Sequence, residues 1–415
     1  MNCALLIIGD ELLAGRTRDL NGHWLSTFLP SVGLNLQQIK IVNDSEEAIK
    51  SSLNELFNSV DIVMTSGGLG PTKDDITKNI IARYFNKELI SDKESEALIH
   101  KLYSKFDREW TPDKNSYHFY PEGFELLDNL NGYAPGLFFK DKTRAILSAP
   151  GVPREFSSMV ENTFIPKIKE SYNSRDFKEL EFFSIRTRGV PEETIFGELC
   201  PTLWDELSTI AKVSSLPHSL GIDIVLYYSP QERDEVIANA TKVVERTKLR
   251  DHVWQYGNLS LPELIVREAT QKKLTIGFAE SCTGGLTSSK ITDISGASSV
   301  FLGSIISYAN SAKTNLLKVD PETIKNFGAV SEQCAKEMAN GVILSIGCDI
   351  AISFTGIAGP GGGTPTKPVG TVGIGWATRE ENSSMIFNHR GNRDALKEKF
   401  SRTGLFKLLD LIRAH

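Results

Sequence analysis

The sequence predicts an α/β protein of three domains. At 415 residues the chain is too long for one ordinary hydrophobic core. Apolar runs of strand length alternate with helical patterns in its first and last parts, which is typical of parallel strands joined by crossover helices. We expect a parallel-sheet domain over residues 1–170, a small α+β domain over 171–256, and an α/β/α sandwich over 257–415.

The first domain should place its loops beside a ligand. Ligands bind beyond the carboxyl ends of parallel strands, where the loops 9–11, 66–75 and 149–153 are rich in turn-forming residues. The expected strands are 5–9, 35–42, 61–65 and 143–147, and the expected helices lie near 21–31, 46–57 and 75–85.

The remaining elements follow from the same patterns. A charged stretch, 167–178, reads as a linker or a frayed helix end, and 251–258 as another boundary. Between them we expect strands at 182–188, 210–215 and 221–228 and helices from Pro191 and over 231–248, without a catalytic cluster. In the last domain Ser331 should start a helix that ends at Ile346, followed by strands 349–354 and 369–377 and a closing helix over 393–413.

Composition excludes several classes of protein. With 24% charged and 40% hydrophobic residues the chain reads as an ordinary soluble protein, and no apolar run is long enough for a membrane span. The net charge of −6 argues against nonspecific binding to nucleic acid. The first residues resemble a strand and not a signal peptide, so we expect a cytoplasmic protein. Five scattered cysteines predict neither a disulfide framework nor a zinc site.

The densest cluster of chemically active residues lies between 277 and 313. An apolar run, 274–279, is followed by small and hydroxylated residues, among them Ser281, Thr283 and Gly284. This pattern indicates a strand that turns into a helix and presents backbone N–H groups to an anion or a carbonyl oxygen.

Ser298 and Lys313 form a candidate pair of nucleophile and base. Lysine can accept a serine proton only if its pKa falls from about 10.4, and burial near Ile305, Ile306 and Leu316 would lower it. The pair requires the chain to reverse, with a helical turn over 298–302 and a returning strand over 304–308. Alternatively, Ser298 caps a turn and Lys313 is a solvated surface residue.

Other residues in the last domain allow both a functional and a purely structural interpretation. Cys282, at a helix start, is a rival nucleophile, although His389 is its one partner in this domain away from the C-terminus, and a buried inert cysteine is commoner. The glycine-rich loop from Thr355 and Gly356 to Gly363 can approach a ligand or be a plain surface loop. Arg393 can grip a phosphate or be surface charge.

In the first domain a glycine-rich loop precedes two acids. Gly67, Gly68, Gly70 and Thr72 can wrap phosphates, and Asp74 or Asp75 can hold a divalent cation, although acids at this place also cap helices.

These motifs together resemble the CinA family of competence/damage-inducible proteins. The last domain carries AESCTGG (279–285), GASSVFLGSIISYANSAK (296–313), GAVSE (328–332), SFTGIAGPGGG (353–363) and KPVGTV (367–372). The first carries GDELLAG (9–15), TSGGLGPTKDD (65–75), NGYAPG (131–136) and PGVPRE (150–155), which look like a molybdopterin-binding-like domain.

The resemblance implies an activity for the last domain. It implies hydrolysis of nicotinamide mononucleotide (NMN) to nicotinate mononucleotide and ammonia without a metal, with Ser298 as nucleophile and Lys313 as base. The implied substrate-binding residues are Tyr308, Thr355 and Arg393, to which we add Ser281, Thr283, Gly284 and Gly356.

For the first domain the resemblance implies a pyrophosphatase that acts on ADP-ribose with a divalent metal, Mg or Co, held by Asp75 and by Asp44 as a second acid. Tyr117-His118 depart from the family pattern and put that activity in doubt. The family also suggests a homodimer that binds small nucleotides and neither nucleic acid nor membrane. The alternatives are a noncatalytic nucleotide-binding regulator and a pterin-binding module.

Overall fold

The computed structural model describes residues 1–72, 75–141, 144–173, 177–218 and 221–415. The chain divides into two compact units. The first unit contains residues 1–183, 202–214 and 225–246, and the second contains 184–201, 215–224 and 247–415.

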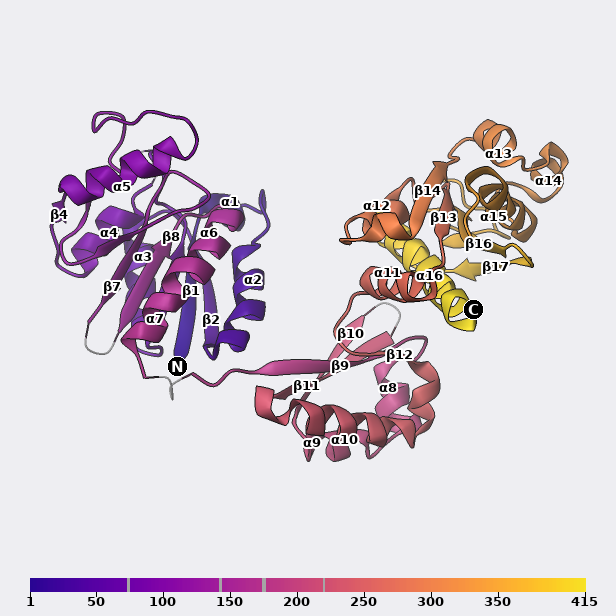
Figure 1. Ribbon diagram of the computed structural model, residues 1–415, viewed down its shortest axis with the longest axis horizontal. Helices are drawn as coiled ribbons and strands as arrows, with labels where there is room; N and C mark the ends of the chain where they lie inside the picture. The colour runs from indigo at the N-terminus through magenta and orange to yellow at the C-terminus, as the bar shows by residue number, and fades with distance from the viewer. Residues whose placement is uncertain (73–74, 142–143, 174–176, 219–220) are drawn as a thin grey trace. The chain divides into compact units, whose positions relative to one another are not determined.

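The first unit contains the predicted parallel sheet, whose strands have the order β2-β1-β3-β8-β7-β6 (Figure 1). Strands β2, β1, β3 and β8 are parallel, and β7 and β6 are antiparallel to their neighbours. The strands are β1 (Asn2–Ile8), β2 (Asn35–Val42), β3 (Ile62–Ser66), β6 (Glu125–Leu127), β7 (Gly136–Lys140) and β8 (Ala145–Ala149).

Helices cover both faces of this sheet because β1 is apolar on both sides. Cys3, Leu5 and Ile7 contribute to one core, and the alternate residues Ala4, Leu6 and Ile8 contribute to the other. Helices α2 (Asn21–Phe28), α6 (Pro153–Met159) and α7 (Ile165–Ser171) pack on the first core, and α3 (Glu46–Phe57) and α4 (Thr77–Tyr84) on the second.

This region contains a helix that the expected elements do not include. Helix α5 (Lys93–Ser104) was not predicted. It begins with a capping box, in which Asp92 accepts a hydrogen bond from Ser95 N (2.7 Å) and Ser95 Oγ accepts one from Asp92 N (3.0 Å). Strand β8 is predicted from Thr143, which lies outside the described residues.

The middle of the chain forms a sheet with the order β10-β11-β9-β12. Its elements are β9 (Glu181–Thr187), α8 (Glu192–Thr194), α9 (Leu203–Ser208), β10 (Lys212–His218), β11 (Gly221–Tyr228), α10 (Arg233–Glu245) and β12 (Val253–Tyr256). The stretch 251–258, read as a boundary, therefore contains a strand, and β12 pairs antiparallel with β9.

The C-terminal sheet has the order β14-β13-β15-β16-β17 and confirms the predicted α/β/α sandwich (Figure 1). Strands β14, β13 and β15 are parallel, and β16 and β17 antiparallel. The strands are β13 (Ile276–Glu280), β14 (Phe301–Ile306), β15 (Ile350–Gly356), β16 (Thr371–Thr378) and β17 (Asn382–Asn388).

The two outer layers of the sandwich pack on separate cores. Helices α11 (Leu261–Lys272), α12 (Leu286–Thr292) and α16 (Arg393–Ala414) cover one face of the sheet, and α13 (Asn310–Leu317), α14 (Pro321–Phe327) and α15 (Glu332–Ile346) lie on the other. As predicted, Ser331 starts α15, where its Oγ accepts a hydrogen bond from Cys334 N (3.2 Å).

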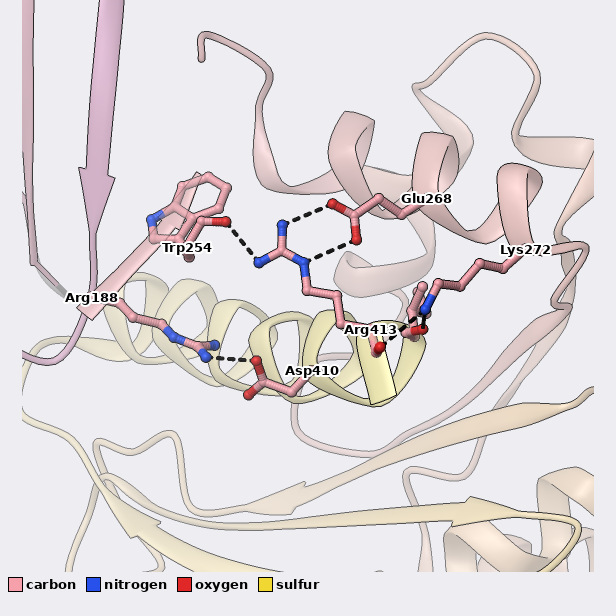
Figure 2. A network of polar contacts seen from close by, with 7 residues as sticks. Arg188, Trp254, Glu268, Lys272, Asp410 and Arg413 are labelled. Atoms are coloured by element: carbon pink, nitrogen blue, oxygen red, sulfur yellow. Dashed lines mark hydrogen bonds and ion pairs between the residues drawn. The ribbon is translucent and has the colours of Figure 1, made fainter. Parts of the chain in front are cut away.

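Ion pairs and hydrogen bonds fix the end of α16 (Figure 2). Lys272 Nζ donates to the carbonyl oxygens of Ile412 (2.8 Å) and Arg413 (3.0 Å), which lack partners within the helix. Arg413 binds Glu268 through two nitrogens (2.8 and 3.0 Å) and donates to Trp254 O (2.8 Å). Helix α16 is thereby tied to α11 and β12.

No helix within the described ranges is long and apolar enough to cross a membrane.

Candidate functional site

Lys313 is a buried amine at the carboxyl end of the C-terminal sheet. Helix α13 holds the side chain, which is 1% exposed. Its Nζ lies 3.0 Å from Ser281 Oγ and donates hydrogen bonds to the carbonyl oxygens of Ser307 (2.8 Å) and Tyr308 (3.3 Å). Burial lowers the pKa of Lys313, because the charged ammonium loses its hydration.

Ser281 is the residue that the fold brings to this amine. It follows β13 directly, and its backbone N–H donates to Phe354 O on β15 (2.9 Å). Strand β13 lies between β14 and β15, so Ser281 stands where the chain connections leave the sheet in opposite directions. Parallel sheets bind ligands at such a switch point.

The structure does not bring Ser298 into contact with Lys313, as the predicted pairing required. Ser298 is exposed, in the short helical turn Ala297–Ser299 that precedes β14, while Lys313 follows that strand. Strand β14 spans Phe301–Ile306, and strands rise about 3.3 Å per residue, so roughly 20 Å of extended chain separates the two ends. The expected reversal over 298–308 does not occur, since β14 runs parallel to β13 through it.

Three other predicted residues lie next to residues that bond to Ser281 or Lys313. Arg393, the first residue of α16, donates to Tyr308 Oη (3.2 Å) and to Gly359 O (2.6 Å), and both side chains are exposed. Thr355 follows Phe354 on β15, and its hydroxyl donates to Ala329 O (2.7 Å). Gly356 ends β15, where a β-carbon would lie 2.9 Å from Thr371 O.

A buried carboxylate, Glu280, organises the turn after β13. Glu280 is 0% exposed and accepts hydrogen bonds from Gly285 N (2.9 Å), Thr287 N (3.1 Å) and Ser288 N (2.8 Å). These N–H groups were expected to face a ligand, and the chain's own carboxylate takes them instead. The turn itself needs glycine, because Gly284 (φ +62°) and Gly285 (φ +98°) have left-handed backbone.

Two buried hydroxyls beside this turn are unsatisfied. Thr283 Oγ1 and Ser307 Oγ have no hydrogen-bond partner among the described residues. Buried hydroxyls normally have partners, so these two are candidates for contact with water or a substrate.

Cys282 does not fit the role of a nucleophile. It is buried, and burial raises its pKa to about 12, which leaves the thiol protonated near neutral pH. Its expected partner His389 instead contacts Thr403 Oγ1 (3.1 Å) and packs on Phe400.

A second candidate site is a cleft of 580 Å³ at the carboxyl ends of β1, β3 and β8. Gly67, Gly68 and Gly70 line it, together with Asp44 and Asp75. A β-carbon on Gly67 would lie 2.2 Å from Ile8 O, and one on Gly68 would lie 2.0 Å from Thr77 Oγ1. These glycines therefore allow close approach of neighbouring chain segments, in addition to any contact with phosphate.

The predicted metal ligands lie in this cleft but do not form a ready-made cluster. Asp75 accepts hydrogen bonds from Thr72 N (2.9 Å) and from the Thr72 hydroxyl, and Asp44 accepts one from Asp10 N (3.0 Å). Within the part of the chain that the structure describes, no three His, Cys, Asp or Glu side chains converge as metal ligands. Asp74 lies outside the described residues. Tyr117 lines the cleft, and His118 is buried beside Trp110.

Comparison with known proteins identifies both halves of the chain. The family profile "CinA C-terminal domain" matches residues 258–412, and "Probable molybdopterin binding domain" matches residues 4–170. A competence-damage inducible protein of Clostridium perfringens is 33% identical over 419 residues, covering 100% of this chain and 98% of the relative. The equivalent protein of Clostridium acetobutylicum is 34% identical over 407 residues, covering 96% of each chain.

Among the solved structures that are similar to this chain is that of the competence/damage inducible protein CihA of Agrobacterium tumefaciens. It is 36% identical, covers 36% of this chain and 94% of its own, and has a TM-score of 0.36.

Sequence reasoning missed Glu280 and paired Lys313 with Ser298, whereas the structure places Ser281 beside it, although one signal was available. Ser281 follows a strand, whereas Ser298 precedes one, and the carboxyl end is where parallel sheets place their sites.

Replacing Glu280 by Gln should destabilise the protein by about 1.5–3 kcal/mol, the range for hydrogen bonds to a charged group. The amide keeps the shape but lacks the charge that receives the N–H groups of the turn. Denaturant unfolding would measure this. The control is Glu398→Gln, which breaks an exposed ion pair with Lys290 and should change stability by less than about 1 kcal/mol. Equal effects of the two substitutions would contradict the role of Glu280.

Proposed function

Since the chain belongs to the CinA family of competence/damage-inducible proteins, we propose that its C-terminal domain hydrolyses the carboxamide of NMN, with Ser281 as nucleophile and Lys313 as base. The family resemblance supplies the substrate. The observation that carries the chemistry is the buried contact of 3.0 Å between Lys313 Nζ and Ser281 Oγ.

An uncharged amine can also make the three contacts of Lys313. A neutral amine has two N–H donors and one lone pair. The carbonyl oxygens of Ser307 and Tyr308 receive the two donors, which leaves the lone pair for the Ser281 hydroxyl proton. Desolvation favours this neutral form, so the lysine can act as a base nearer neutral pH.

The reaction follows from this arrangement. Lys313 takes the proton as Ser281 Oγ attacks the carboxamide carbon, and then gives it to the departing nitrogen, which leaves as ammonia. Water, activated by the same amine, hydrolyses the resulting ester to nicotinate mononucleotide and frees Ser281. Arg393, held beside Tyr308, is positioned to receive the phosphate of the substrate.

A second activity is favoured by the acidic cleft of the first domain. Among the described lining residues of this cleft, the carboxylates outnumber the one arginine, Arg18, so a pyrophosphate would need a cation in order to bind; the acids are Glu11, Asp19, Asp44, Asp75 and Glu155. Mg²⁺ commonly uses only one or two carboxylates besides phosphate oxygens and water, which fits Asp75 and Asp44. We propose metal-dependent hydrolysis of ADP-ribose here.

Ser281→Ala should lower NMN deamidation by roughly a thousandfold or more, as expected for loss of a nucleophile. Ser298→Ala is the matched control, and its rate of deamidation should stay within about twofold of that of the parent protein. Ser298 is exposed and lies before the amino end of β14, away from Lys313. Ammonia release from NMN is the measurement. The reverse result would restore Ser298 as nucleophile, and no release by the parent protein despite NMN binding would favour a noncatalytic regulator.

The rate of deamidation should depend on pH through Lys313. The protonated amine cannot act as base, so kcat/KM should fall as pH falls through the lowered pKa, which lies below the value of about 10.4 for free lysine. A pH–rate profile would locate this acidic limb. Lys313→Arg should be inactive at every pH, because guanidinium keeps its proton. Substantial activity in Lys313→Arg would exclude lysine as the base.

Asp75→Asn should reduce Mg²⁺-dependent hydrolysis of ADP-ribose by roughly tenfold or more and leave NMN deamidation unchanged. Asp113→Asn, an exposed change outside the cleft, is the control and should alter neither activity. Chromatography of the products would follow the reaction. Undiminished turnover by Asp75→Asn would remove this residue from the site.

A further inference from the structure

Glu155 stands apart from the other acids that line the N-terminal cleft. Three of those acids, Asp19, Asp44 and Asp75, accept hydrogen bonds from backbone N–H groups of nearby residues, and Glu11 is exposed. Glu155 is partly buried in the first turn of α6, beyond the carboxyl end of β8, and its carboxylate is held by another side chain. It therefore has a defined position in the cleft and no backbone group to cap.

A fully buried amide fixes the carboxylate of Glu155. Asn129 is 0% exposed, and its Nδ2 donates to Glu155 Oε2 (2.6 Å) and to Ala134 O (2.8 Å). Its Oδ1 accepts a hydrogen bond from Asn131 N (3.1 Å), so the amide cannot turn without losing these contacts. Among the described residues, Asn129 is the one side chain that bonds to this carboxylate, which leaves Glu155 Oε1 for a water molecule.

The surroundings of Glu155 are shaped to hold a carboxylate. A β-carbon on Gly132 would lie 2.1 Å from Glu155 Oε2, so this position needs glycine for the carboxylate to fit. Tyr117 lines the same cleft; burial raises its pKa, and the carboxylates of Asp75 and Glu155 raise it further. The phenol therefore stays neutral near neutral pH, and Glu155 and Asp75 lie toward the same part of the cleft.

The environment of Glu155 favours proton binding. Burial raises its pKa above the usual range of a glutamate, because the carboxylate loses hydration, and the hydrogen bond from Asn129 lowers it by a smaller amount. A positioned carboxylate with a raised pKa suits a general base. Asp75 and Asp44 do not suit that role if they hold a cation, because a bound cation disfavours protonation of its ligands.

We propose that Glu155 is the general base of the N-terminal cleft. This inference rests on the ADP-ribose hydrolysis proposed above and adds the group that activates the water. Glu155 Oε1 accepts a proton from the water whose oxygen attacks one phosphorus of the pyrophosphate. The bond from that phosphorus to the bridging oxygen breaks, the bridging oxygen keeps the electron pair, and the products are AMP and ribose 5-phosphate. Glu155 then releases the proton to solvent.

The test uses the full-length protein with ADP-ribose and Mg²⁺. Glu155→Gln keeps the size of the side chain but cannot take a proton, so kcat should fall by roughly a hundredfold or more. Affinity for the α,β-methylene analogue of ADP-ribose, measured by calorimetry, should stay within about threefold, because a base contributes to the transition state and not to ground-state binding. Glu161→Gln, an exposed change outside the cleft on the helical turn after α6, should alter neither quantity.

Gly132→Ala displaces the same carboxylate without removing it. The new methyl group meets the flexible end of Glu155, and Gly132 does not have left-handed backbone, so the fold should tolerate the change and the midpoint of denaturant unfolding should stay the same. We expect kcat to fall by roughly tenfold or more, because a misplaced catalytic group loses much of its effect. An unchanged kcat would contradict a role that depends on the position of this carboxylate.

The remaining outcomes separate failure of this proposal from failure of the activity. Undiminished kcat in Glu155→Gln, with an active parent protein, would remove Glu155 from the reaction and leave the hydrolysis standing. Binding of the analogue weakened by about tenfold or more in Glu155→Gln would assign this residue to the substrate or the cation and overturn its role as base. No hydrolysis of ADP-ribose by the parent protein would overturn the activity itself.

Discussion

The candidate amidase site depends on the burial of one amine. Lys313 is removed from water, and its Nζ hydrogen-bonds to two carbonyl oxygens and a hydroxyl, all of which are uncharged groups. An ion pair with an acid would stabilise the ammonium form and raise its pKa, whereas the loss of hydration on burial lowers the pKa of Lys313. The packing of the surrounding sheet and α13 must therefore offset the free energy that desolvation of this amine costs.

A second constraint, the buried carboxylate of Glu280, shapes the loop that carries the serine. A helix start with unpaired N–H groups would attract an anion, but here the protein supplies that anion itself. These N–H groups are therefore not available to an external anion, whereas the exposed guanidinium of Arg393 lies at the start of α16 beside Tyr308. Glu280, the last residue of β13, thus provides the carboxylate that fixes the turn, and Ser281, which follows it, provides the hydroxyl that contacts the lysine.

Both large sheets place their candidate sites at the carboxyl ends of parallel strands, but they use opposite electrostatics. The N-terminal cleft is lined by acids, which suits a cation bridging to phosphate. The C-terminal site contains a desolvated amine and an exposed arginine. This combination suits the proposed attack of a serine hydroxyl on an amide, with the amine as base. A shared architecture therefore does not imply a shared chemistry, because the loops beyond the strands decide it.

The sequence by itself determined the fold class and many of the elements. Strand β2 and helix α3 have the predicted bounds, and Ser331 starts α15 as its hydroxyl and the following Glu332 indicated. Periodicity and caps are local signals, so they can be read before the chain is folded. The burial of Lys313 was also anticipated, although Ile306 and Leu316, expected to cover it, are exposed.

Tertiary structure decided which hydroxyl meets the lysine. Ser281 is 32 residues from Lys313 in the sequence, and Ser298 is only 15 residues from it. Yet Ser298 lies before the amino end of β14, whereas Lys313 lies beyond the carboxyl end of that strand. The parallel pairing of β14 with β13 explains this difference. In parallel strands the carboxyl ends lie side by side, so the residues that precede the strands lie at the opposite end of the sheet. Spacing along the chain carries no information about that register, so only the folded sheet could choose between the two serines.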